Sequence, residues 1–153
     1  MRYINKIAEA LIVLLFTAIV IAGTLQVFNR FVLNISLSWS EEFQKFAFIW
    51  LVFISIPVAY NRAAHLRVDT FLGLFPAAVQ RALRWIIDLM WVGLGLSLIV
   101  YTSRLMQVTQ HQLSPGLGIS MAAVYAGMVV GGLYLVLCVG AAMLARIKAG
   151  HAS

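Results

Sequence analysis

The sequence predicts an all-α integral membrane protein with four transmembrane helices. Of its 153 residues, 63% are hydrophobic and only 10% are charged, and the mean hydropathy is +0.96. This composition lies well outside that of a soluble globular domain. One span of a bilayer core about 30 Å thick needs roughly 20 mostly apolar residues, so the chain has room for several spans and short connections. We therefore expect a single transmembrane domain over residues 1–153.

The apolar runs define the expected spans, and strand-like alternation is absent. Because only helices and closed barrels satisfy backbone polar groups in lipid, each run predicts a helix. The first run follows Arg2 and Lys6, as a signal peptide would, but it is longer than such a segment and has no cleavage site, so we interpret it as a retained span. The four spans are expected at residues 8–28, 43–60, 79–106 and 119–145.

The basic residues predict the orientation. Eight of the eleven Lys and Arg residues lie near one side of the predicted membrane domain and three near the other. Because basic residues accumulate on the cytoplasmic side, we expect both termini in the cytoplasm. The net charge of +6 is spread over span ends and forms no patch, which favours lipid headgroups over nucleic acid. The eight are Arg2, Lys6, Arg62, Arg67, Arg81, Arg84, Arg146 and Lys148, and the three are Arg30, Lys45 and Arg104.

Two further features concern the membrane interfaces. The inner loop contains VDTFLGLF (68–75), whose apolar residues recur at helical spacing. We expect a short helix lying in the interface and ending at Pro76. Trp39, Trp85 and Tyr101 fall near predicted interfaces, where amphipathic rings normally lie.

The segment SWSEE (38–42) precedes the second span. Ser38 and Glu41 match a capping box, and Lys45 follows Glu41 at i,i+4 spacing. Glu41 and Glu42 in the first turn also complement the helix dipole. The segment is therefore expected to start and anchor the second span, with docking of a soluble partner on the outer side as the alternative.

Two charged residues have more than one interpretation. Arg30 either pairs with Glu41 or Glu42 across the first loop or extends to the interface unpaired. Asp88 is the one carboxylate that could lie inside the bilayer, where an acid is a candidate functional group. It follows Arg84 by four residues, so we expect an ion pair with Arg84 near the cytoplasmic interface.

Small residues recur every four positions in the fourth span, at Ala123, Gly127 and Gly131. Gly93 and Ser97 do the same in the third span. Such stripes let another helix approach closely, without specifying which helix that is.

The sequence carries no recognisable catalytic, cofactor or metal motif, and we expect no enzyme activity. Cys138 is the single cysteine, which excludes a disulfide or CxxC pair within the chain. His65, His111 and His151 lie in predicted loops or the tail, which disfavours the haem of a respiratory membrane anchor. That anchor and a small proton-coupled exporter remain the alternative functions, and the exporter would need a mid-span carboxylate.

Three loop motifs in order resemble the small membrane subunit of the tripartite ATP-independent periplasmic (TRAP) transporters. They are NRFVLNISLSWSEE leading into FAFIWLVFIS, NRAAHLRVD after the second span, and SPGLGIS before the fourth. The resemblance covers nearly the whole chain. Ser55 and Ser120 depart from the pattern, where glycine and proline are expected. The matching positions are Arg30, Asn34, Trp39, Glu42, Trp50, Arg62, His65, Asp69, Ser114, Pro115, Leu117 and Gly118.

The resemblance implies a scaffold in a bacterial inner membrane. A periplasmic binding protein would deliver an organic acid, of the carboxylate or sugar acid class, to a large elevator-type subunit that binds Na⁺. This chain would bind no cofactor and would brace the large subunit, which its small-residue stripes would contact. Side chains at the membrane interfaces would resist tilting of this scaffold in the bilayer. His65 could form a cluster with Arg62 and Asp69 that fixes the inner loop. The expected anchors are Trp39, Arg62, Arg67, Arg81 and Arg84.

Overall fold

The computed structural model describes residues 2–35, 37–63 and 76–150. In these ranges the chain forms four long α-helices, all of them long and apolar enough to cross a membrane. The prediction of four spans is thereby confirmed, whereas the interfacial helix expected at 68–75 lies outside the described residues. The helices are α1 (Arg2–Phe28), α2 (Ser38–Ala63), α4 (Ala77–Thr109) and α5 (Met121–Gly150), and a π-helix, η1 (Asn29–Leu33), extends α1.

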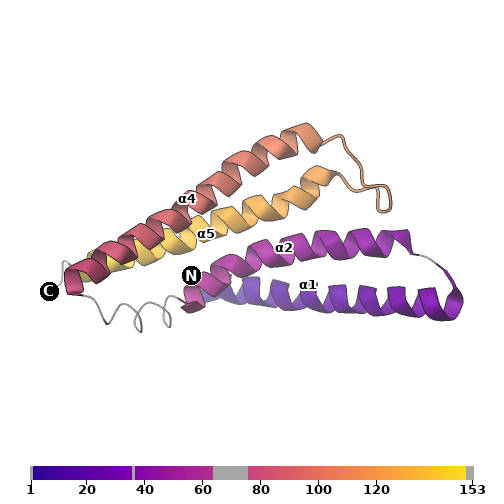
Figure 1. The fold of residues 1–153 in the computed structure, drawn as a ribbon, viewed down its shortest axis with the longest axis horizontal. Helices are drawn as coiled ribbons and strands as arrows, with labels where there is room; N and C mark the ends of the chain where they lie inside the picture. The colour runs from indigo at the N-terminus through magenta and orange to yellow at the C-terminus, as the bar shows by residue number, and fades with distance from the viewer. Residues whose placement is uncertain (1, 36, 64–75, 151–153) are drawn as a thin grey trace.

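The four helices lie in a row, in the order α1, α2, α5, α4. The main contacts are those of α1 with α2, α2 with α5, and α4 with α5. Figure 1 shows the two antiparallel pairs, with the α1–α2 turn and the α4–α5 loop at one end and both chain termini at the other. In the most apolar windows of the central helices α2 and α5, 28% and 33% of residues are buried, against 6% and 11% in α1 and α4. The edge helices therefore present most of their apolar surface outward.

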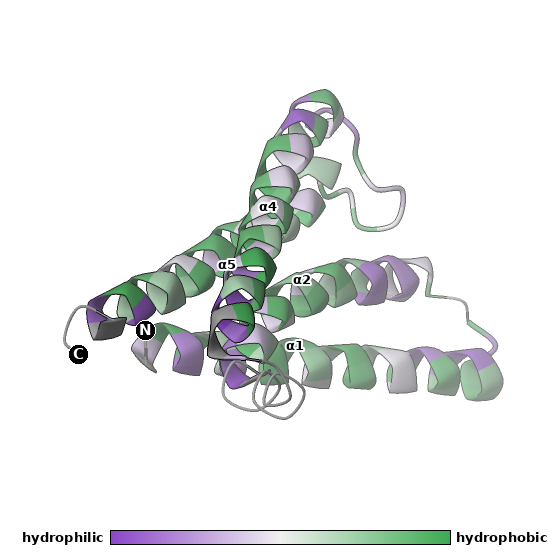
Figure 2. Cartoon of the chain, turned by 60° about the vertical axis from the view of Figure 1, so that its left-hand side comes forward, coloured by the Kyte–Doolittle hydropathy of each residue, from purple (hydrophilic) through white to green (hydrophobic). Residues whose placement is uncertain are grey.

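The core lies between the two central helices. Ile54 and Val58 of α2 meet Leu135, Cys138 and Val139 of α5, all of them buried. Hydrophobic residues cover the middle of the helices, and hydrophilic residues gather towards their ends (Figure 2). This distribution is the one that a bilayer requires.

The small-residue stripe of α5 packs against α2 of the same chain. A Cβ atom added to Gly127 would lie 2.8 Å from the Trp50 ring, and one added to Gly131 would lie 2.8 Å from the Phe53 carbonyl carbon. The Trp50 indole N–H also donates to the Ala123 carbonyl at 3.3 Å. Gly127 and Gly131 are thus helix-packing residues as predicted, but the helix they pack against is α2 of the same chain and not one of the large subunit.

A second close approach joins α4 to α5, and it uses a different glycine from the one expected. A Cβ atom on Gly95 would lie 2.6 Å from Val136 Cγ2 and 3.2 Å from the Gly132 carbonyl oxygen. A Cβ atom on Gly93 would meet nothing within 4 Å. Two residues turn an α-helix by about 200°, so Gly93 points away from the contact that Gly95 makes.

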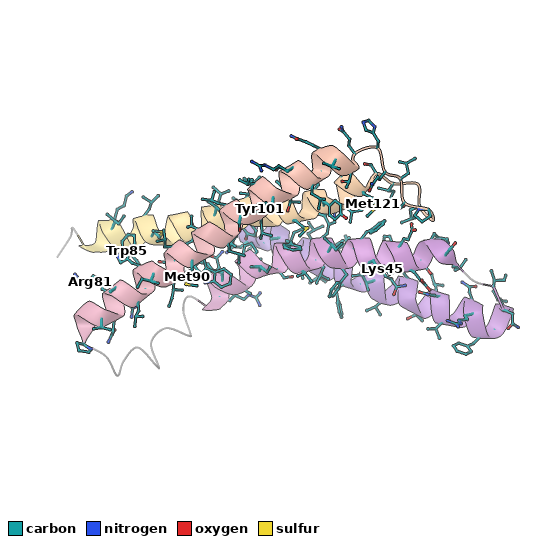
Figure 3. The ribbon with its side chains drawn as sticks, turned by 45° about the horizontal axis from the view of Figure 1, so that its top comes forward. Lys45, Arg81, Trp85, Met90, Tyr101 and Met121 are labelled. Atoms are coloured by element: carbon teal, nitrogen blue, oxygen red, sulfur yellow. The ribbon has the colours of Figure 1, made fainter. Side chains whose placement is uncertain are left out.

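The edge helix α4 carries large side chains along its outward surface. Arg81, Trp85, Met90 and Tyr101 follow one another along it (Figure 3). The Trp85 and Tyr101 residues are 40% and 71% exposed. Sixteen residues separate the two rings, about 24 Å along the helix, which is comparable to the thickness of a bilayer core. Their placement at the two interfaces stays a prediction.

Candidate functional site

In the described ranges, most side-chain hydrogen bonds between helices fall in two clusters, one at each end of the row. The loop-end cluster lies beside the α1–α2 turn, and the terminal-end cluster lies towards the two termini. The loop-end cluster comprises Gln26, Ser40, Glu41, Glu42, Gln44 and the loop 114–119. The terminal-end cluster comprises Asn5, Glu9, Tyr60, Asn61, Arg62, Asp88, Tyr134, Cys138 and Arg146.

Glu42 binds the loop that joins α4 to α5. The Gly116 N–H lies 3.0 Å from each carboxylate oxygen of Glu42, and the Leu117 N–H lies 3.0 Å from Oε2. Hydrogen bonds to an ionised acceptor are roughly twice as strong as neutral ones. The N-terminal part of α2 is thereby joined to a loop more than seventy residues away in the sequence.

The loop conformation explains the glycines of the SPGLG motif. The Gly118 N–H donates to the Ser114 carbonyl at 2.9 Å, and the Ser114 N–H donates to the Ile119 carbonyl at 2.9 Å. Gly118 has a φ of +65°, a left-handed conformation that glycine adopts readily. A Cβ atom on Gly116 would lie 3.0 Å from the Glu42 carboxyl carbon. Gly118 is therefore needed for the turn itself, and Gly116 leaves room for the Glu42 carboxylate to approach the loop.

Ser120, which departs from the resemblance, has a structural role of its own. Its hydroxyl donates to the Gln110 carbonyl at 2.8 Å and accepts from the Ala122 N–H at 3.3 Å. The residue thus closes the base of the loop and caps the start of α5.

Glu41 connects α2 to α1. Its carboxylate accepts a hydrogen bond from Gln26 Nε2 at 3.2 Å, and Gln44 Nε2 donates to Gln26 Oε1 at 2.6 Å. Among the described residues Glu41 does not close a capping box with Ser38, and Arg30, which is exposed, bonds neither glutamate. The capping box is therefore a wrong prediction, because Glu41 bonds Gln26 of the packed helix α1 instead. Of the two alternatives for Arg30, the pair with a glutamate is not formed.

At the terminal end, Asp88 of α4 joins α2 and α5. The Tyr60 hydroxyl donates to Asp88 Oδ1 at 2.8 Å, and the Arg146 guanidinium forms an ion pair with Oδ2. Asp88 is only 3% exposed. An ion pair was expected, but with Arg84. Because α4 and α5 are antiparallel, the last turns of α5 lie beside the first turns of α4 and bring Arg146 to the carboxylate.

A neutral network lies beside this ion pair and joins α1, α2 and α5. The Tyr134 hydroxyl donates to Asn5 Oδ1 at 2.6 Å. Asn61 Nδ2 donates to Asn5 Oδ1 at 3.3 Å and to Cys138 Sγ at 3.1 Å. Sequence reasoning did not identify Asn5 or Tyr134, although an asparagine beside an apolar run is a signal that could have found the first.

Arg62 completes the terminal-end cluster. Its guanidinium lies 2.8 Å from Glu9 Oε1, and the two side chains are 72% and 41% exposed, so the pair contributes little to stability. It links the end of α2 to α1. His65 and Asp69, the expected partners of Arg62, lie outside the described residues.

The chemistry of both clusters is that of attachment between helices. Each acidic residue in the described ranges bonds to another part of the chain: Glu9, Glu41, Glu42 and Asp88. Within those ranges no group of three or more His, Cys, Asp and Glu side chains could hold a metal ion. Of the three histidines, the structure describes His111, which is exposed in the α4–α5 loop.

Replacing Glu42 with glutamine is expected to increase hydrogen exchange at the Gly116 and Leu117 amides by several-fold. The amide side chain keeps the size of the carboxylate but loses the charge that these hydrogen bonds stabilise. Glu41→Gln is the matched control, because Glu41 bonds Gln26 instead of the loop. Hydrogen exchange followed by mass spectrometry measures both variants, and equal protection of the loop in Glu42→Gln and wild type would contradict the assignment.

Comparisons with known proteins agree with this picture. Residues 19–149 match the family model described as tripartite ATP-independent periplasmic transporters, DctQ component. A putative TRAP transporter small permease protein of Haemophilus influenzae is 26% identical over 86% of this chain and 82% of its own length. The sialic acid TRAP transporter small permease protein SiaQ of Vibrio cholerae is 25% identical over 88% of this chain and 78% of its length.

A third relative shows how such a chain is combined with a larger one. The isethionate TRAP transporter permease protein DctMQ of Oleidesulfovibrio alaskensis is 32% identical over 52% of this chain, which is only 13% of that protein. A segment like this chain is thus part of a much longer permease there. This chain belongs to the DctQ family, and it is a small permease subunit of a TRAP transporter, which pairs with a large permease subunit and is not an enzyme.

Proposed function

We propose that this chain is the static brace of the large permease in a sodium-coupled importer of an organic acid. The observation that carries the proposal is that hydrogen bonds between side chains, and between side chains and backbone, join the helices at both ends of the row. A carrier domain that moves across the membrane needs a neighbour that stays fixed. A row of helices with hydrogen bonds between them at both ends resists sliding of one helix against the next.

The use of the acidic side chains supports the brace over an independent transporter. An intramembrane carboxylate that carries protons or ions faces a cavity or a pathway. Asp88 is instead buried against Tyr60 and paired with Arg146. A small proton-coupled exporter built on Asp88 is therefore the weaker candidate.

Sodium and substrate are proposed to bind elsewhere in the complex. Two relatives carry sialic acid and isethionate in their names, and both compounds are organic acids. We place Na⁺ on the large permease and initial capture of the acid on a periplasmic binding protein. This chain supplies neither site.

The proposed location is the bacterial inner membrane, with both termini in the cytoplasm. The termini lie at the same end of the helix row (Figure 1), and the eight-to-three bias of basic residues favours the cytoplasm for that end. In a Cys138→Ala background, a membrane-impermeant maleimide should label His111→Cys in intact spheroplasts and Lys148→Cys only after permeabilisation. The opposite pattern would reverse the orientation.

Reconstitution tests the function directly. The large permease that pairs with this chain is placed in proteoliposomes with and without it, and uptake of sialic acid, isethionate and simple carboxylates is measured with the binding protein outside. Uptake that needs this chain, the binding protein and an inward sodium gradient is the expected result. Full uptake without this chain would overturn the brace, and proton-linked export by this chain alone would establish the exporter.

A further inference from the structure

The two antiparallel helix pairs, α1–α2 and α4–α5, diverge towards the loop end of the row (Figure 1). Trp50 is the first residue of α2 that packs against the hydrophobic core. Its indole N–H bonds the carbonyl of Ala123, which lies just after the start of α5 at Met121. The packed seam between the two pairs therefore starts at Trp50, and the part of α2 from Ser38 up to it extends beyond the beginning of α5.

The α4–α5 loop (110–120) reaches back towards this part of α2 (Figure 1). The loop is bonded to itself and to the helix ends beside it. The Met121 N–H donates to the Gln112 carbonyl at 2.9 Å, and the Ser120 hydroxyl donates to the Gln110 carbonyl at 2.8 Å. Together with the bonds between Ser114 and Ile119, these contacts hold the loop to the α4–α5 pair as one unit.

Glu42 attaches this loop to the other helix pair. Its carboxylate accepts hydrogen bonds from the Gly116 and Leu117 N–H groups, each at 3.0 Å. Among the described residues, no other group of α1 or α2 forms a hydrogen bond with the loop. Glu42 lies eight residues before Trp50, about 12 Å along the helix. The attachment therefore acts beyond the seam, where it opposes rotation of one pair away from the other.

We propose that Glu42 and the α4–α5 loop form a clasp that sets the opening between the two helix pairs at their loop end. The part of α2 before Trp50 contributes no residue to the hydrophobic core, and regions with few buried apolar contacts open at a low free-energy cost. Releasing the carboxylate would let the α4–α5 pair swing outward. The hinge is the seam itself, where a Cβ atom on Gly127 would lie 2.8 Å from the Trp50 ring.

The test measures a distance in the complete complex with its large permease, held in lipid nanodiscs. In a Cys138→Ala background, spin labels are attached to Arg30→Cys and Gln107→Cys, two exposed positions near the loop ends of α1 and α4. Pulsed electron paramagnetic resonance gives the distance between them. Glu42→Ala is expected to shift this distance to values longer by several ångström, because no group of α2 then holds the loop.

A second label pair and a control variant separate the clasp from a general loss of structure. Labels at Lys6→Cys and Lys148→Cys report on the terminal end, where Glu42→Ala should keep the wild-type distance. Glu41→Ala removes the neighbouring carboxylate, which bonds Gln26 within the α1–α2 pair, and should change neither distance. An unchanged loop-end distance in Glu42→Ala would overturn the proposal, since the seam alone would then set the opening. Equal shifts in both glutamate variants, or at both ends, would overturn it too.

The clasp extends the proposed brace, and its effect on transport rests on that function. Uptake by the Glu42→Ala complex therefore tests the two ideas separately. A longer loop-end distance with slower uptake would support both. A longer distance with wild-type uptake would support the clasp and show that transport does not need a fixed opening. An unchanged distance would overturn the clasp whatever the rate of uptake.

Discussion

Asp88→Ala is expected to lower the free energy of unfolding by roughly 2–3 kcal/mol. Removing one partner of a buried ion pair typically costs about 3–5 kcal/mol, because the other charge is left uncompensated. The Asp88 side chain is 4% exposed, but that of Arg146 is 37% exposed. Water therefore compensates part of the charge left on Arg146, and the expected loss is smaller than that of a fully buried pair. The Tyr60 hydroxyl also loses its acceptor.

A double-mutant cycle assigns this loss to the ion pair. Arg146→Ala and the combined variant are compared with Asp88→Ala by equilibrium unfolding in mixed micelles, followed by tryptophan fluorescence. The combined variant should lose less than the sum of the two single losses, because they remove the same contact. Simple additivity would mean that the pair contributes nothing, and Asp88 would again become a candidate for ion or proton handling.

Gly131→Leu is expected to separate the two central helices and to prevent assembly with the large permease. The new Cβ atom would lie 2.8 Å from the Phe53 carbonyl carbon, which is backbone and cannot rotate away. Inserting atoms into a packed interface typically costs about 1–3 kcal/mol, and more where backbone must move. The displaced helices would also lose the core around Leu135 and Val139.

Gly93→Leu is the matched control, since a Cβ atom there meets nothing within 4 Å. Both variants place the same side chain in a long apolar helix, so differences in helix propensity cancel. Thermal unfolding and copurification with the large permease measure the two effects. Native stability of Gly131→Leu would show that α2 does not pack against this position, and loss of assembly in Gly93→Leu alone would place the permease on α4.

The four spans could be predicted from the sequence because each depends on a local property, the hydropathy of its own residues. A bilayer requires about 20 apolar residues per helix wherever the helix packs, so hydropathy alone locates it. The helix ends were less predictable. Helical hydrogen bonding continues into charged turns after the apolar run stops, and α1 accordingly begins at Arg2 and α2 at Ser38.

The candidate site was only partly predictable. Glu42, Arg62, Asp88 and the SPGLG loop were identified from their residue types or from the family resemblance. Their partners were not, because charged residues were matched with neighbours in sequence. Asp88 was assigned to Arg84, four residues away, whereas it pairs with Arg146, 58 residues away.

By itself, the sequence determined the four spans through its hydropathy, and its loop motifs carried the resemblance to the small TRAP subunit, because both are readable along the chain. Only the tertiary structure decided which surfaces are already occupied. The stripe of Ala123, Gly127 and Gly131 looked available to a partner, yet α2 packs on Gly127 and Gly131 and bonds the Ala123 carbonyl. A periodic pattern specifies a helix face, but which helix covers that face depends on the order α1, α2, α5, α4, and that order is set by contacts between residues far apart in the sequence.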